Sequence, residues 1–401
     1  MSRLEELIQQ HCPDGVEYKS IESITKSICS GLNPRKNFTL NGKGATCHYL
    51  TVKEMTTGKI VFSDKTDKIT PDAVNIIQNR SRLEIDDILL SGIGTIGKVA
   101  IVDIPVDNWN CSESVLLLKP NKEIVCPKYL KYILEGNETQ TYFNSHATGS
   151  TLKGIRQKDL RTHSIPVPPL PVQEEIVRIL DNFAELQAEL QAELQKRLQQ
   201  YNYYRDKLLS FNDLNGGGYA VSVEWKKLGD VCELGTGSHN TQDGLTEGQY
   251  PFYTRGSEVL YLNDYDYDET AIITAGDGAG VGKVFHFVKG KYALHQRAYR
   301  IVPNEKDVLP RYVYYYIGAT FYDYIMRNSV SSSVVSIRRP MMVNCPIPVP
   351  PLAEQQRIVD ILDRFSTLTT DITAGLPTEI EARRKQYEYY RDQLLTFKQK
   401  A

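Results

Sequence analysis

The sequence predicts an α+β protein in which two similar mixed α/β domains alternate with two long helices, as a pseudo-twofold internal repeat. The segment 165–211 opens with alternating prolines and then continues to Phe211 without a further Pro or Gly after Pro171. The segment 347–397 has the same opening, IPVPPL, and a closely similar ending, YEYYRDQLLTF against YNYYRDKLLSF. The regions that precede these two segments also align with each other. Such self-similarity indicates two related structural halves.

The first globular domain is predicted over residues 16–164, after a short N-terminal helix in residues 1–15 that ends at the turn Cys12-Pro13-Asp14-Gly15. Within this domain, short apolar runs alternate with Gly, Asn, Asp and Ser clusters, a pattern typical of strands and turns. The strand predictions are HYLTV, KIVFS, DDILLS, KVAIVD and SVLLLK.

The central helical segment is predicted over residues 165–213 and carries an apolar seam with steps of three and four residues. The seam residues are Ile176, Leu180, Phe183, Leu190, Leu194, Tyr201, Tyr204 and Leu208, and the register is interrupted at Gln187 and Arg197. The unit AELQ occurs three times in tandem over residues 184–195. A four-residue insertion in a heptad seam locally unwinds a coiled coil, whereas Ala, Glu, Leu and Gln all favour the helix.

A Gly-rich linker at residues 214–222 precedes the second globular domain, residues 223–346, whose start VEWKKL matches VEYKSI. The C-terminal helical segment, residues 347–401, repeats the seam at Ile358, Leu362, Phe365, Leu368 and Ile372. Gly375 and Pro377 are expected to break this second helix. Two matched helices favour an antiparallel coiled coil, and packing of each helix on its own domain is the simpler alternative.

Composition limits the protein class. The formal charge of −2 argues against coating of nucleic acid by bulk charge but is compatible with local basic loops. The seven cysteines are scattered without a C-x-x-C pair, which predicts reduced thiols in a cytosolic protein and no zinc site. No apolar run reaches the length of a membrane span, and the polar start MSRLEELIQQ is not a signal peptide.

The loop from Gly92 to Gly97 fits G-x-G-x-x-G and nearly fits a Walker A loop. Phosphate binding needs a helix directly after such a loop, but KVAIVD reads as a strand and Val99 occupies the Walker Ser/Thr position. A Gly-rich hairpin is the favoured interpretation, and an NTPase would require Lys98 for nucleotide binding. The chain contains no recognisable catalytic motif, so catalysis by this chain alone is not predicted.

The two halves place different polar residues at one aligned position, where Ser112-Glu113-Ser114 corresponds to His295-Gln296-Arg297. Gln pairs with adenine, Arg with guanine, and Glu accepts from cytosine N4, so two readers of different DNA sequence would show this pattern. Solvated loops that diverged are the alternative. Further candidates in the first half are Arg35, Lys36, Asn37, Lys98, Thr148, Ser150 and Lys153. In the second half they are His239, Asn240, Gln242, Arg255, Lys283, Ser331, Ser332, Ser333 and Arg338. The Lys and Arg residues are expected mainly on phosphates.

Across essentially the whole chain, this layout resembles the specificity (S) subunit of type I restriction–modification enzymes. The resemblance rests on the two IPVPPL entries, the paired Y-x-YYRD-x-LL endings and the tandem AELQ units. It implies a non-catalytic subunit with two target recognition domains, each reading one half of a bipartite, asymmetric site in double-stranded DNA. The helices would form a spacer and a platform for methyltransferase subunits.

The resemblance also implies partners and cofactors. Two methyltransferase (M) subunits would use S-adenosylmethionine to methylate adenine N6, and two restriction/translocase (R) subunits would use ATP and Mg²⁺. This chain would bind no cofactor and would act in the cytoplasm of a bacterial or archaeal cell, away from membranes. Two alternatives stay open: an orphan or methylation-only specificity subunit, and a coiled-coil scaffold with two binding domains.

Overall fold

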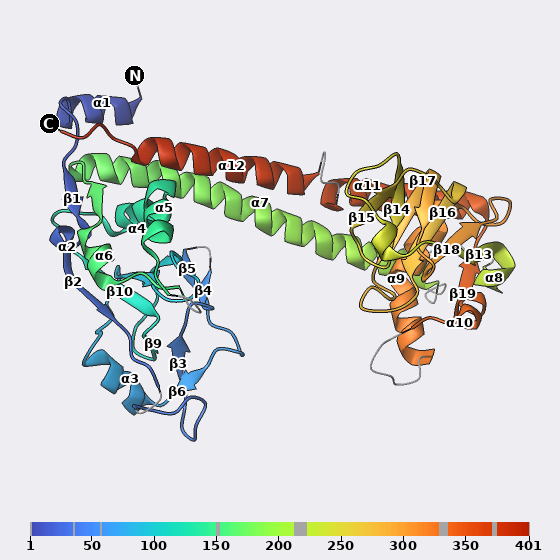
Figure 1. Cartoon of the computed structure of the whole chain (residues 1–401), viewed down its shortest axis with the longest axis horizontal. Coiled ribbons are helices and arrows are strands. Elements are labelled where there is room, and N and C mark those ends of the chain that lie inside the picture. Colours follow the sequence, from blue (N-terminus) through green and yellow to red (C-terminus); the bar gives the residue numbers. More distant parts are fainter. Residues whose placement is uncertain are drawn as a thin grey trace. The chain divides into compact units, whose positions relative to one another are not determined.

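The computed structural model describes residues 2–34, 37–56, 58–149, 153–211, 223–328, 336–370 and 375–400 (Figure 1). The chain forms two compact units, one from Met1–Glu189 with Ile380–Ala401 and the other from Leu190–Glu379. Helix α7 (Leu170–Ser210) contributes residues to both units. None of the helices in the described residues is long and apolar enough to cross a membrane.

The first unit contains small sheets and short helices besides its share of α7. Its strands are β1 (Tyr18–Ser20), β2 (Thr25–Ser30), β3 (Cys47–Leu50), β4 (Met55–Thr56), β5 (Lys59–Ile60), β6 (Lys68–Ile69), β7 (Ile88–Ser91), β8 (Val99–Ile101), β9 (Trp109–Cys111), β10 (Val115–Pro120) and β11 (Ser164–Pro166). Its helices are α1 (Arg3–His11), α2 (Ile21–Ile24), α3 (Pro71–Gln78), α4 (Pro127–Glu135), α5 (Asn137–His146) and α6 (Gln157–Thr162), together with most of α12 (Leu376–Leu395).

The core of the first unit lies on both faces of the four-stranded sheet β2-β10-β7-β8. Strand β10 is antiparallel to both of its neighbours. Leu116 and Leu118 face a core shared with the helices, and Leu117 faces a second core that holds Trp109. Burial on both faces explains why this strand, VLLLKP, is a continuous apolar run instead of an alternating one. The parallel pair β3–β9 lies beside this second core.

The second unit repeats this order in one six-stranded sheet, β13-β18-β16-β17-β14-β15. Its long strand β17 pairs antiparallel with β16 and parallel with β14, and so combines the pairings of β8 and β9. The strands are β12 (Glu224–Lys227), β13 (Cys232–Thr236), β14 (Tyr250–Tyr253), β15 (Val259–Leu262), β16 (Tyr267–Ala275), β17 (Phe285–Leu294), β18 (Ala298–Pro303) and β19 (Pro346–Val349). The helices are α8 (Leu228–Val231), η1 (Thr241–Asp243), α9 (Pro310–Asn328), α10 (Arg339–Val343) and α11 (Leu352–Thr370).

The predicted strands and the predicted hairpin are confirmed. The five apolar runs of the first domain overlap with β3, β5, β7, β8 and β10. The loop between β7 and β8 is a hairpin in which Gly94 has φ of 84°, and a strand rather than a helix follows it. A phosphate-binding loop therefore does not form here. The long helix starts only at Leu170, because the prolines before it extend the chain and Ile165 pairs with Lys19 in β1–β11.

The second helical segment is interrupted where the sequence indicates. Helix α11 ends at Thr370, and α12 begins at Leu376 with Pro377 in its first turn, where proline is tolerated. The side chain of Leu368, residue Ile372 and the linker 214–222 lie outside the described part of the chain. The prediction of a linker there stays a prediction.

Helix pairing is seen within each unit separately. In the first unit, Phe183 of α7 stacks on Tyr390 of α12 with ring centroids 5.8 Å apart and approaches Tyr387 at 6.5 Å. In the second unit, Tyr204 of α7 stacks on Phe365 of α11 at 5.6 Å. The seam is tight near each domain, where Ile176, Leu180 and Ile358 are fully buried. It loosens over the AELQ units, where the seam residues Leu190 and Leu194 are only partly buried.

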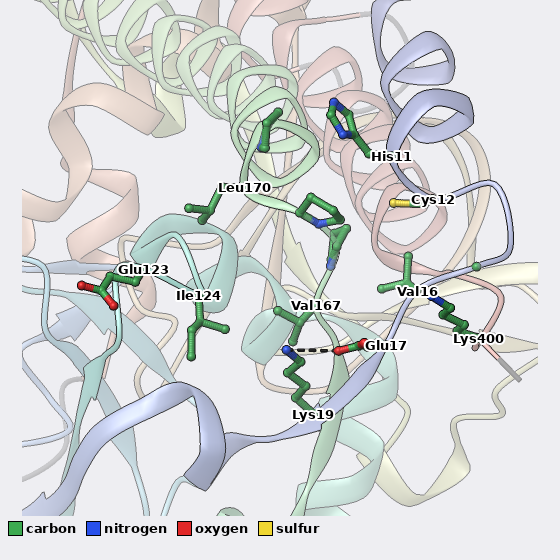
Figure 2. Close-up of a pocket in the computed structure, with 14 residues that line it drawn as sticks. His11, Cys12, Val16, Glu17, Lys19, Glu123, Ile124, Val167, Leu170 and Lys400 are labelled. Carbon is green, nitrogen blue, oxygen red and sulfur yellow. Dashed lines mark ion pairs between the residues drawn. The ribbon is translucent and has the colours of Figure 1, made fainter.

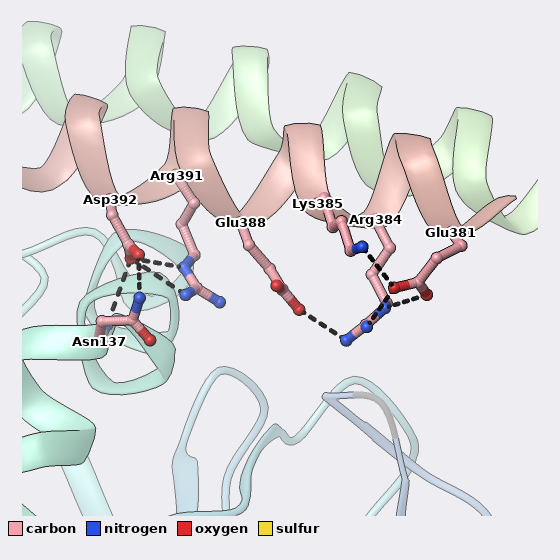
Figure 3. Close-up of polar contacts among 7 residues, drawn as sticks. All are labelled: Asn137, Glu381, Arg384, Lys385, Glu388, Arg391 and Asp392. Atoms are coloured by element: carbon pink, nitrogen blue, oxygen red, sulfur yellow. Dashed lines mark hydrogen bonds and ion pairs between the residues drawn. The ribbon is translucent and has the colours of Figure 1, made fainter. Parts of the chain in front are cut away.

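The face of α12 turned away from α7 carries an ion-pair ladder (Figure 3). Arg384 pairs with Glu381 at 2.8 Å and with Glu388 at 3.0 Å. Exposed pairs of this kind contribute little to the stability of the protein and mainly support the helix. Nearer the C-terminus, Asp392 accepts hydrogen bonds from the backbone N–H of Asn137 at 3.2 Å and from its side-chain amide at 2.5 Å. This contact fastens α12 to the start of α5.

A fully buried glutamine fixes the start of α7 on the first domain. The Gln173 Oε1 accepts the backbone N–H of Cys126 at 2.8 Å. Its Nε2 donates to the carbonyls of Ile124 and Pro168, at 3.0 and 2.6 Å. The side chain therefore joins the proline segment before α7 to the start of α4, and it satisfies three backbone groups that burial would otherwise leave unpaired.

The second unit has the same arrangement around Gln355, which is also fully buried. Its Oε1 accepts the N–H of Leu309 at 2.8 Å, and its Nε2 donates to the carbonyls of Asp307 and Pro350, at 3.1 and 2.8 Å. We call Gln173 and Gln355 the two glutamine clamps. Each clamp is accompanied by a tyrosine hydroxyl that donates to a carbonyl of the proline segment, Tyr129 to Pro166 and Tyr312 to Pro348.

Replacing Gln355 by leucine should lower the free energy of unfolding by about 3 kcal/mol, because one N–H and two carbonyls lose their partner inside the protein. Gln356→Leu is the matched control on the same helix. Gln356 is exposed and donates a hydrogen bond to Asp360 of its own helix, so its replacement should change the free energy of unfolding by no more than about 0.5 kcal/mol. Chemical denaturation of both variants measures the difference. Equal stability of the two would contradict the role of the clamp.

Acid should weaken the first unit through His163. This ring is buried, stacks on Tyr142 at 4.0 Å and lies 3.2 Å from Thr139 Oγ1. Burial, and to a smaller degree His146, lowers the pKa of His163 to about 4. Between pH 6.5 and pH 4 the unfolded chain therefore binds a proton that the folded chain excludes, and stability falls by about 3 kcal/mol as the pH falls.

The fluorescence of Trp109, which is fully buried in the first unit, provides the readout for denaturation at each pH. His163→Phe should remove most of this pH dependence between pH 6.5 and pH 4, whatever its effect on stability at neutral pH. An unchanged slope in the variant would show that another group is responsible.

Candidate nucleic-acid interface

The aligned polar residues form a turn that is held by the same backbone hydrogen bonds in both units. In the first turn, residues 112–114, the N–H of Ser112 donates to Leu50 O at 2.9 Å. The carbonyl of Ser114 accepts the N–H of Gly92 at 2.8 Å, and Gly92 O accepts the N–H of Ile155 at 2.9 Å. The first turn, the Gly92 hairpin and the segment before α6 are thereby joined.

The second turn, residues 295–297, has equivalent bonds. The N–H of His295 donates to Tyr253 O at 3.0 Å. Arg297 O accepts the N–H of Gly276 at 2.8 Å, and Gly276 O accepts the N–H of Ile337 at 2.8 Å. The alignment made from the sequence is therefore also an alignment of backbone geometry, with different side chains on one framework.

A close backbone approach and an asparagine complete the framework. A Cβ on Gly237 would lie 1.8 Å from Leu294 O, and one on Gly31 would lie 1.9 Å from Cys111 O, so only glycine fits at either position. The Asn240 side-chain oxygen accepts the Gln296 amide at 2.5 Å. In the first unit, the Asn33 amide donates to the carboxylate of Glu113 in the equivalent place.

Sequence reasoning missed Asn33. The spacing between glycine and asparagine is one residue longer in the second unit, which hides the match between Gly31…Asn33 and Gly237…Asn240. A search for Gly followed within three residues by Asn after the first long strand of each half would have found it.

Most candidates in the first unit lie close to the first turn. Thr148 pairs with Gly154, and Lys153 O accepts the N–H of Gly94 at 2.9 Å. The side-chain amide of Asn37 donates to Asn33 O at 2.7 Å. Lys98 lies at the end of the Gly92 hairpin, exposed, with its Nζ 3.4 Å from Val52 O. Arg35, Lys36 and Ser150 lie outside the described residues.

In the second unit, the structure brings His239, Asn240 and Arg255 next to the second turn. The carbonyl of His239 accepts the N–H of Gln296 at 2.9 Å. The ring Nε2 of His239 lies 3.3 Å from the carboxylate of Asp266.

The remaining candidates of the second unit lie farther along the surface. Gln242 is exposed on η1, and Arg338 is exposed at the start of α10. Lys283 is exposed, with its Nζ 5.2 Å from the ring centre of Tyr322. Ser331, Ser332 and Ser333 lie outside the described residues.

Two predicted contact residues are instead internal supports of the turns. Ser112 is buried, and its hydroxyl lies 2.6 Å from that of Ser114. His295 is buried, and its Nδ1 accepts the N–H of Arg297 at 2.9 Å. Burial, followed by the charge of Arg255, lowers the pKa of His295, so its ring is a neutral acceptor. The exposed residues of the two turns are Glu113, Gln296 and Arg297.

Sequence reasoning also missed Asp277. Its carboxylate accepts from Arg255 at 2.8 Å and from Arg297 at 3.0 Å. Aligning the two hairpins glycine by glycine places Ile93 at the position of Asp277, and Gly94 and Gly278 both have φ of 84°. The aligned sequences therefore show that a carboxylate in the second half replaces an isoleucine in the first half. They do not show which arginines bind this carboxylate.

A pocket of ≈ 570 Å³ lies beside the proline segment that precedes α7 (Figure 2). Its lining includes His11, Glu123 and Lys400, together with Lys19 and Glu17, which form an ion pair at 3.1 Å. No candidate contact residue lines it. Among the described residues, no group of three or more His, Cys, Asp or Glu side chains could hold a metal ion.

The sequence profile described as "Type I restriction modification DNA specificity domain" matches the chain twice, at residues 13–200 and 221–382. Each match contains one globular domain. The two matches therefore correspond to the internal repeat that the sequence and the turn geometry show independently.

Individual proteins are similar to the chain over most of its length. The type I restriction enzyme EcoR124I/EcoR124II specificity subunit of Escherichia coli is 41% identical over 58% of this chain, and the match spans 61% of that subunit, less than two thirds. A putative specificity subunit of Haemophilus influenzae is 32% identical over 65% of this chain and 70% of its own length. The crystal structure of an S subunit from M. genitalium superposes with a TM-score of 0.60 at 17% identity, over 95% of this chain and 96% of that one.

The framework glycine should tolerate no side chain. Gly237→Ala forces β13 away from Leu294 and should lower the free energy of unfolding by about 1–3 kcal/mol. Gly318→Ala, within α9 and facing open space, should instead raise it by up to about 1 kcal/mol. Denaturation midpoints of the two variants test this difference. A neutral Gly237→Ala would show that the turn does not need the close approach.

Proposed function

The chain belongs to the family of type I restriction-modification DNA specificity domains, and on that premise we propose that it is a non-catalytic subunit that recognises DNA sequence. Each globular domain reads one half of a bipartite, asymmetric site in double-stranded DNA. The single observation that carries this proposal is the pair of turns: one hydrogen-bonded framework occurs twice and presents different side chains each time.

The exposed turn residues have the chemistry for base recognition. Gln296 and Arg297 can pair with adenine and guanine edges, and Glu113 can accept from the amino group of cytosine. Lys98, Lys283 and Arg338 are exposed cations and are assigned to phosphates, which position the protein without specifying sequence. A duplicated framework with unlike side chains predicts a site whose two halves differ.

We propose partners on the same premise. The Escherichia coli relative is named as the specificity subunit of a type I restriction enzyme. By analogy, two methyltransferase subunits that use S-adenosylmethionine would dock on the helices of this chain and methylate adenine N6, and two restriction/translocase subunits would supply ATP- and Mg²⁺-dependent cleavage. The seven free cysteines fit a reducing cytoplasm. The net charge of −2 fits a subunit whose partners add to the grip on DNA.

Selection of random DNA by the chain in complex with its methyltransferase partner tests this function. The bound fragments should share two short conserved blocks separated by a fixed number of variable base pairs. The chain alone should bind more weakly and lose less affinity with added salt, because fewer phosphates are neutralised. Absence of any enriched sequence from a folded, assembled complex would contradict DNA recognition and favour a scaffold.

Helix length is proposed to set the spacer between the two halves of the site. The three AELQ units, residues 184–195, lie entirely within helix α7. One unit adds ~6 Å and ~40° of rotation to a helix. One base pair adds ~3.4 Å and ~34–36° to DNA. The rotation matches one base pair and the translation nearly two, and we take the rotation as decisive, so deletion of residues 188–191 should shorten the variable spacer by about one base pair.

Methylation mapping of the deletion variant measures the new spacer directly. Replacing Glu189 and Gln191 by alanine is the matched control, because it changes the same unit at constant helix length and should leave the spacer unchanged. An unaltered spacer in the deletion variant would exclude helix length as its determinant.

A further inference from the structure

We propose that Asp277 is a positioning residue that holds Arg255 and Arg297 as a guanine reader, so that the half-site of the second domain contains a G·C pair. This inference rests on the proposed DNA-recognition function and extends it to the composition of one half-site. We call the three residues the arginine pair and its carboxylate.

The geometry is that of one carboxylate shared by two guanidinium groups. Oδ1 of Asp277 accepts Arg255 Nη1 at 2.8 Å, and Oδ2 accepts Arg297 Nη1 at 3.0 Å. Each arginine uses one terminal nitrogen for this bond. Among the described residues, neither guanidinium donates a further side-chain hydrogen bond, so both keep donors for a ligand.

The framework decides which end of this cluster faces solvent. The Asp277 side chain is 19% exposed, whereas those of Arg255 and Arg297 are 41% and 64% exposed. The backbone of Asp277 is fixed on both sides, by the bond from Gly276 N–H to Arg297 O and by a bridge to Ser336. The carboxylate is thus the inner anchor, and the guanidinium groups extend outward beside Gln296.

The charge of the cluster favours a base over a phosphate. Burial would raise the pKa of Asp277, but the hydrogen bonds and charges of the two arginines outweigh it and hold the pKa below its usual range. The carboxylate is therefore ionised and cancels half of the positive charge of the pair. This weakens the attraction of the cluster for a phosphate, whereas the neutral O6 and N7 acceptors of guanine match the remaining arginine donors.

The first domain provides an internal comparison. Ile93 replaces Asp277 and is exposed, and the first turn contains no arginine. The same framework therefore lacks both the anchor and the reader in the first domain. A guanine requirement created by this cluster should appear in one half of the site only.

Selection of randomised DNA by the assembled complex with the methyltransferase partner tests the proposal, with wild type, Arg297→Ala and Asp277→Asn compared. Arg297→Ala should reduce the preference for one G·C pair by about 5- to 150-fold, the range expected for one bidentate arginine contact. Asp277→Asn should relax the same position to a smaller degree, because the arginines remain but lose their anchor. Adding Asp277→Asn to Arg297→Ala should cause little further loss there.

Lys283→Ala is the matched control. Lys283 is an exposed cation on the same hairpin as Asp277, but its side chain is not one of the partners of the Asp277 carboxylate. It should weaken binding to all sequences similarly and leave the base preference unchanged. An unaltered preference in the other half-site shows in each variant that the complex is folded and bound.

Two results would overturn the inference while leaving DNA recognition intact. The first is a bipartite site in which Arg297→Ala relaxes no position or only A·T pairs. The second is uniform weakening by Arg297→Ala, as expected for a phosphate contact. Failure of the wild-type complex to enrich any bipartite site would instead remove the proposed function, and this inference with it.

Discussion

The structure depends on how each long helix is fastened to its globular domain, and a buried glutamine does this twice. Gln173 and Gln355 each satisfy one N–H and two carbonyls at the point where the proline segment meets the helix. A buried polar side chain with all of its partners in place specifies one geometry, because any other leaves backbone groups unpaired in a medium of low dielectric constant. The direction in which each helix leaves its domain is therefore fixed by hydrogen bonds as well as by apolar packing. This constraint explains why IPVPPL recurs without change while the domain surfaces diverge.

The same division between a fixed framework and variable side chains applies to the two turns. Three features recur in both domains: the backbone hydrogen bonds of the turn, a glycine packed closely against a backbone carbonyl, and an asparagine that bonds to the turn. The exposed residues of the turns differ. Ser112 and His295 occupy equivalent positions, are buried, and stabilise their turns through hydrogen bonds. Glu113, Gln296 and Arg297 face outward. In such a design the residues that carry specificity can be exchanged without altering the fold, because none of them contributes to the core.

Much of this architecture was predictable from the sequence, because each half of an internal repeat can be compared with the other. The two halves, the long helices, the break near Gly375 and Pro377, and the hairpin after β7 all follow from periodicity and from proline and glycine chemistry. The start of α7 at Leu170 was not predicted, because the proline segment looks continuous with the helix until β11 is seen to pair with β1. Asp277 and Asn33 were missed for a different reason. Their partners, Arg255, Arg297 and Glu113, lie far from them in sequence, and only the folded sheet brings these side chains together.

We propose that one chain carries two independent readers of DNA on matched frameworks. A map of methylated adenines in an unmethylated host that expresses this chain with its methyltransferase partner would show whether it does. We expect a split motif of two unlike halves, with one methyladenine in each half on opposite strands and a constant gap between them. A single uninterrupted motif, or no modification by a partner shown to be folded and bound to this chain, would contradict it.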